Sequence, residues 1–126
     1  MQAENDGFTV LLDTREILTD IPSTIVASTR EFAASSPDKT VRFLRALDKA
    51  TDLIRRDKER AIALGIRHGL RGDIAVERKA LDYYVADLDI RLKKENITAL
   101  LKQIDISDPP QKYFDDTYLT WAVGPR

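Results

Sequence analysis

The sequence contains no cysteine and a single histidine, His68. Disulfide bonds, thiolate metal sites and cysteine nucleophiles are therefore excluded, as is any site that needs two histidines. His68 stands between Arg67 and Gly69 at an expected helix end, where a positive charge is favourable, so we interpret it as a capping residue. Because no catalytic or metal-binding motif surrounds it, we predict that the protein is not an enzyme and holds no cofactor or metal.

Long hydrophobic runs are also missing. No stretch approaches the roughly 18 uninterrupted apolar residues that a membrane-spanning helix requires. Residues 1–7 are polar and acidic and lack the basic and apolar regions of a secretory signal. Glycine is scarce, with five residues, and none falls in a dinucleotide-binding or phosphate-binding loop pattern.

An excess of charge of either sign is absent as well. Lys and Arg total 20 against 21 for Asp and Glu, which gives a net charge of −1 and argues against a general nucleic-acid binder. The chain of 126 residues is 43% hydrophobic, which is typical of one globular domain. We therefore expect a single domain over residues 1–126 that binds no nucleic acid.

Two short runs have the composition of β-strands. Phe8–Leu12 and Thr24–Ala27 are rich in β-branched and apolar residues, and Ile21-Pro22 marks the entry to the second run. Two strands cannot form a stable sheet by themselves. We therefore predict that their edges pair across chains, as a homodimer, or are covered by the helices.

Helical patterns occupy the rest of the chain. Ser28 and Glu31 fit a capping box, and Ser36-Pro37-Asp38 signals the start of a helix that reaches about Arg56. Further helices are expected over 58–67 after Asp57, from Asp73, from Lys93, and over 114–121. The adjacent acids Asp115 and Asp116 lack the spacing of a calcium loop, so we interpret one or the other of them as a helix cap.

Polar residues at the ends of the two expected strands are the candidate ligand-binding residues. Asp13, Thr14 and Arg15 follow the first strand, and Ser23 opens the second. In α/β folds such positions commonly line a ligand crevice. An ordinary exposed loop is the alternative interpretation of the same residues.

Three groups of residues, in order along the chain, form a more specific pattern. The first is Val26, Ala27, Ser28 and Phe32; the second is Pro37, Val41, Phe43, Leu44, Ala46, Lys49 and Ala50; the third is Asp116, Thr117, Tyr118, Leu119 and Ala122. Together they resemble the C-terminal part of the periplasmic substrate-binding proteins of ABC importers for nitrate, sulfonates, taurine and thiamine-pyrimidine precursors. The resemblance covers residues 8–122, whereas members of that family are more than twice as long.

The resemblance implies a helix-rich α/β chain, the C-terminal part of a type II periplasmic-binding-protein fold, with two short strands followed by about five helices. It implies a periplasmic parent protein that binds a small organic or anionic solute and presents it to ABC permease subunits. The alternative is a stand-alone helical module that docks a partner protein and has no role in transport.

Overall fold

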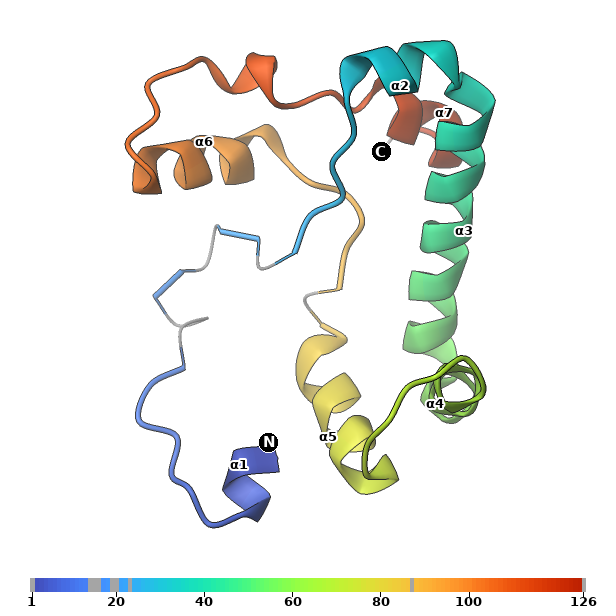
Figure 1. Cartoon of the computed structure of the whole chain (residues 1–126), viewed down its shortest axis with the longest axis vertical. Helices are drawn as coiled ribbons and strands as arrows, with labels where there is room; N and C mark the ends of the chain where they lie inside the picture. Colours follow the sequence, from blue (N-terminus) through green and yellow to red (C-terminus); the bar gives the residue numbers. More distant parts are fainter. Residues whose placement is uncertain (1, 14–16, 19–20, 23, 87, 126) are drawn as a thin grey trace. The chain divides into compact units, whose positions relative to one another are not determined.

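The computed structural model describes residues 2–13, 17–18, 21–22, 24–86 and 88–125 (Figure 1). Their elements are α1 (Gln2–Asn5), α2 (Arg30–Ser35), α3 (Pro37–Arg56), α4 (Lys58–Arg67), α5 (Ile74–Tyr84), α6 (Lys94–Gln103), the 3₁₀ turn η2 (Pro110–Lys112) and α7 (Thr117–Val123). The chain divides into unit 1 (Met1–Asp13 and Lys49–Asp89) and unit 2 (Thr14–Asp48 and Ile90–Arg126), so that α3 contributes to both. The expectation of a single domain stays a prediction.

The expected α/β fold is wrong, because the residues that the structure describes form helices and no strand. Phe8–Leu12 and Thr24–Ala27 have no regular secondary structure. Their side chains are largely exposed, with Phe8 at 70% and Leu11 at 94%. A β-strand exists only where a second strand completes its hydrogen-bond ladder, and β-propensity alone does not supply one.

In unit 1, the break between α3 and α4 is set by Asp57. Its Oδ1 accepts a hydrogen bond from the backbone N–H of Arg60 at 3.0 Å, which confirms the predicted helix cap. The helix α4 then buries Ile62, which is 4% exposed, and packs against α5. Asp73 caps α5 in the same way, through the N–H of Ala75 at 2.7 Å.

The turn from α4 to α5 requires a glycine. Gly69 has a φ of +102°, which side-chain-bearing residues rarely adopt. The N–H of Leu70 reaches back to the carbonyl of Gly65 at 2.8 Å, and the Leu70 side chain lies against Gly65. This combination is a Schellman-type ending, which satisfies the last carbonyls of α4 and points the chain towards α5.

In unit 2, the buried apolar residues among those described lie on α2 and on α6. They are Ala33, Ile97 and Leu101, and α6 packs against η2. The first turn of α2 is capped by Thr29, whose hydroxyl accepts from the N–H of Phe32 at 3.1 Å, one residue later than the predicted Ser28. The start of α3 at Pro37 is confirmed.

Arginine side chains tie α7 and the segment before it to the rest of unit 2. Arg45 on α3 donates from Nε to the carbonyl of Ala122 at 3.1 Å and from its Nη2 to that of Trp121 at 3.2 Å. Arg91 donates to the carbonyl of Gly124 at 3.3 Å. These cations satisfy carbonyls at the C-terminal end of α7 that no helical N–H can reach.

Candidate functional site

The predicted ligand-binding residues are only partly described by the structure. Asp13 is half-buried, and its carboxylate accepts a hydrogen bond from the phenol of Tyr83 on α5. Thr14, Arg15 and Ser23 lie outside the described residues, so their ligand-binding role stays a prediction. Tyr83 is not among the predicted site residues. The signal that could have found it is the adjacent pair Tyr83-Tyr84, because a partly buried tyrosine needs a hydrogen-bond partner for its hydroxyl.

The Asp13 contact holds the N-terminal segment on α5. A further contact joins Oε2 of Glu4 to Nζ of Lys79 at 3.7 Å. Lys79 and Tyr83 are one helical turn apart, so the segment is held near both of its ends over a short stretch of α5. The apolar residues between these contacts, Phe8–Leu12, are exposed.

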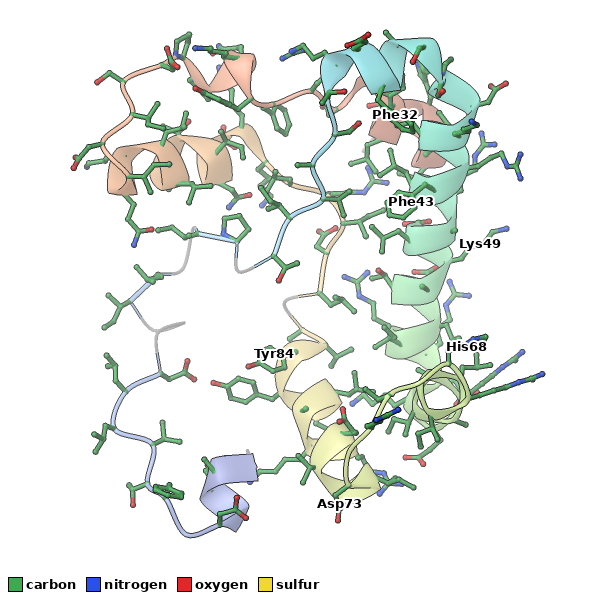
Figure 2. The ribbon with its side chains drawn as sticks, in the orientation of Figure 1. Phe32, Phe43, Lys49, His68, Asp73 and Tyr84 are labelled. Atoms are coloured by element: carbon green, nitrogen blue, oxygen red, sulfur yellow. The ribbon has the colours of Figure 1, made fainter. Side chains whose placement is uncertain are left out.

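His68 lies at the end of α4, as its sequence neighbours predict (Figure 2). Its backbone N–H donates to the carbonyls of Leu64 and Gly65 at 3.0 Å, and its side chain is exposed. Among the described residues, no three acidic or histidine side chains gather closely enough to hold a metal ion. His68 is therefore a helix C-cap.

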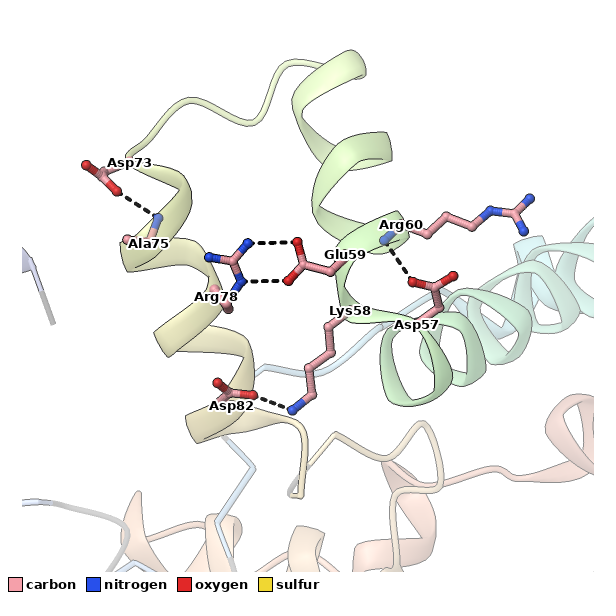
Figure 3. A network of polar contacts seen from close by, with 8 residues as sticks. All are labelled: Asp57, Lys58, Glu59, Arg60, Asp73, Ala75, Arg78 and Asp82. Carbon is pink, nitrogen blue, oxygen red and sulfur yellow. Dashed lines mark hydrogen bonds and ion pairs between the residues drawn. The ribbon is translucent and has the colours of Figure 1, made fainter.

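A network of ion pairs joins α4 to α5 (Figure 3). Arg78 donates from Nε to Glu59 Oε1 at 2.6 Å and from Nη2 to Glu59 Oε2 at 2.7 Å, and Lys58 pairs with Asp82. The hydrogen bonds from Arg78 lower the pKa of Glu59, and the same contact raises the pKa of Arg78. Each of these two pairs joins a residue of α4 to one of opposite charge on α5, so the network links the two helices.

The acids near α7 are likewise engaged in local structure. Oδ1 of Asp115 accepts from the N–H of Thr117 at 3.0 Å, while the N-cap residue of α7 is Asp116, which makes no side-chain cap bond. The hydrogen bond from the Thr117 side chain, followed by that from its N–H, lowers the pKa of Asp115. Oδ2 of Asp108 accepts from Lys112 Nζ and from the Tyr113 hydroxyl, both at 2.6 Å. The bond from Lys112, followed by that from Tyr113, lowers the pKa of Asp108.

Two open clefts occur among the described residues of unit 2. One, of about 460 Å³, lies between the end of α6 and η2, with Lys102, Asp105 and Asp108 on its wall. The other, which we call the α6–α7 cleft, encloses about 400 Å³. Its walls carry the cations Arg91, Lys93 and Lys94, the acids Glu95 and Asp116, the Thr120 hydroxyl and the apolar residues Leu92, Phe114, Leu119 and Pro125.

The α6–α7 cleft has the chemistry to hold an anionic group with an apolar part. Its volume lies in the range of small-molecule sites, and both lysine side chains are exposed. The two acids on its wall oppose the field of the cations, and solvent screens the exposed charges. The arrangement therefore supports weak anion binding.

Comparisons of this chain with protein-family models, with curated proteins and with solved structures gave no match. In the part of the chain that the structure describes, no helix combines the length and the apolar character needed to cross a membrane.

Proposed function

We propose that this chain is a C-terminal portion of the periplasmic substrate-binding component of an ABC importer. The solute would be small and organic or anionic, such as a sulfonate, nitrate, taurine or a thiamine-pyrimidine precursor. In the complete protein, two lobes would close around the solute and present it to the permease subunits. The chain itself would carry no catalytic activity.

The observation that carries the proposal is the order of the motif residues together with the helices they begin. The helix α3 starts at Pro37, at the head of the second motif group, and α7 starts at Thr117 inside the third. Capping and core residues recur in many helical proteins, so each group alone is weak support. Three groups in the family's order, two of them at observed helix starts, support the assignment more strongly.

Isothermal titration with nitrate, taurine, an alkanesulfonate and an aminopyrimidine tests the proposal. The 126-residue chain should bind these solutes little, because the proposal places much of the solute crevice in other parts of the complete protein. Micromolar binding by this chain alone would contradict the proposal. Weak anion binding that Lys94→Gln abolishes would belong to the α6–α7 cleft, and Lys49→Gln, on α3, serves as the matched control.

The reading frame upstream of this sequence supplies the second test. The proposal expects an export signal and a first lobe encoded there, with genes for a permease and an ATPase nearby. An upstream region without a lobe-encoding frame, in a neighbourhood without transport genes, would refute it.

A helical interaction module is the second candidate function. The observation that favours it is the exposure of large apolar side chains on helices, with Phe43 of α3 at 53% and Trp121 of α7 at 58%. Such a module would bind a defined partner protein through these side chains. Phe43→Ser and Trp121→Ser would then weaken that complex, and an unchanged affinity for both variants would count against this candidate.

A further inference from the structure

Two surfaces of unit 1 have complementary character. The first, which we call the basic turn, is residues 66–74, which comprise the end of α4, the turn after it and the first residue of α5 (Figure 3). The second, which we call the acidic segment, is residues 4–13. We propose that the acidic segment of one copy binds the basic turn of a second copy, so that the chain forms a reciprocal dimer.

The basic turn exposes apolar and cationic side chains together. Ile66, Leu70 and Ile74 are each more than 40% exposed. Arg67 and Arg71 are exposed, and neither has a side-chain hydrogen bond or ion pair to the described residues. An exposed apolar group beside unpaired cations fits a partner that is apolar and acidic.

The acidic segment has that chemistry. It carries Glu4, Asp6 and Asp13 and no lysine or arginine, and the apolar run Phe8–Leu12 lies between its acids. Leu11 is 94% exposed, so almost all of its side chain can be removed from water by a partner. The contacts of Glu4 with Lys79 and of Asp13 with Tyr83 restrain the segment before any partner arrives. Restraint of this kind lowers the entropy cost of association.

Each copy carries both surfaces, so two copies can exchange the same contact twice about a two-fold axis. The competing arrangement is direct pairing of Phe8–Leu12 with itself. Antiparallel pairing about Val10 would bring Asp13 beside the Asp6 of the other copy, and like charges at adjacent positions oppose pairing. The charges therefore favour binding of the acidic segment to the basic turn over pairing of that segment with itself.

Sedimentation velocity over a range of protein and salt concentrations tests the proposal. We expect a monomer–dimer equilibrium whose Kd rises about tenfold or more as salt increases from about 0.05 to about 0.5 M. Self-pairing of the acidic segment would respond in the opposite direction, because salt screens its repulsion. A chain that is monomeric at every concentration, or whose association strengthens with salt, would overturn the proposal.

Matched substitutions separate the two halves of the contact. Arg71→Glu should raise the Kd at least about tenfold, and Asp6→Arg in the same chain should restore much of the affinity. The control Arg42→Glu alters an exposed arginine of α3 and should leave the Kd unchanged. If Arg42→Glu and Arg71→Glu weaken the dimer equally, the effect is one of net charge and the basic turn is not the site.

The apolar half is tested by Leu11→Ser, which should raise the Kd at least about tenfold. Ile104→Ser, at an exposed position of unit 2, is its control and should have no effect. Circular dichroism of each variant should match that of the parent chain, because both side chains face water in the monomer. An unchanged Kd for Leu11→Ser would refute the role of the acidic segment.

Discussion

Arg30, at the start of α2, holds the segment before α7 through three contacts. Its Nη2 donates to the backbone carbonyls of Gln111 at 3.0 Å and of Lys112 at 3.1 Å, and its Nη1 lies 3.3 Å from Oδ2 of Asp115. One guanidinium thus spans two carbonyls and a carboxylate, which a shorter or non-planar side chain cannot do. We expect Arg30→Ala to release this segment locally.

The size of the effect follows from the exposure of the contact. The Arg30 side chain is 63% exposed and that of Asp115 is 40% exposed, so the ion pair contributes little after solvent screening. The two hydrogen bonds to carbonyls are charge-assisted but partly solvated, and each contributes on the order of 0.5–1 kcal/mol. The total is about 1–2 kcal/mol, which corresponds to a roughly 5- to 30-fold change in the local opening equilibrium.

Amide hydrogen exchange measures that opening directly. The N–H groups of Lys112, Tyr113 and Phe114 donate to the carbonyls of Pro109 and Pro110 and report on the turn η2. In Arg30→Ala these amides should exchange about 5- to 30-fold faster than in the parent chain. Arg30→Lys keeps the charge but cannot bridge all three acceptors, so its exchange rates should be intermediate.

The control for this measurement is Arg42→Ala, because Arg42 is an exposed arginine without a side-chain contact to the described residues. Its η2 amides should exchange within about twofold of the parent rates. If Arg30→Ala leaves the same amides unchanged, or if both substitutions accelerate them equally, the reasoning from the three contacts is refuted.

Further predictions concern caps, the glycine turn and acid sensitivity. Asp57→Ala should lower the free energy of unfolding by about 1 kcal/mol in urea titration, because it removes a cap hydrogen bond. Asp116→Ala changes an N-cap that makes no side-chain hydrogen bond, so it should lower the free energy of unfolding by less than about half as much. Equal losses for the two variants would contradict the role of the Asp57 cap bond. Gly69→Ala should lower the free energy of unfolding by about 1 kcal/mol through backbone strain alone, since no atom lies within 4 Å of the added Cβ. An unchanged urea midpoint for this variant would contradict the strain argument. Asp108 has a lowered pKa because Lys112 donates to it, so its stabilising effect is complete above about pH 4 and is lost as pH falls through the folded-state pKa. Carboxyl NMR titration should show that Lys112→Gln raises this pKa, and no change would contradict the cause.

The local sequence predicted much of the helical structure. Asp57 and Asp73 cap the helices expected after them, and Pro37 opens α3 as expected, because each signal acts on a backbone N–H or a φ angle within one turn. The predicted end of α3 near Arg56 is also confirmed. The cap of α2 is Thr29 and not the predicted Ser28. The two neighbouring residues both carry a hydroxyl that can cap a helix, so the sequence alone did not distinguish them.

The expected strands were wrong for the opposite reason. The composition of Phe8–Leu12 favours extended backbone, but a strand also needs a partner ladder that no local pattern specifies. The described part of the chain supplies none. Of the four predicted site residues, only Asp13 is described, and its contact with Tyr83 joins positions 70 residues apart.

By itself, then, the sequence determined where α3, α4 and α5 begin, that no thiol or histidine pair can act, and which residues form the motif groups. Those properties depend on composition or on interactions within a few residues. Only the tertiary structure decided that Tyr83 binds Asp13, that Arg30 spans Gln111 and Asp115, and that Phe8–Leu12 faces water. Contacts between distant residues depend on how elements pack, and hydrophobic periodicity marks a buried face without naming what covers it.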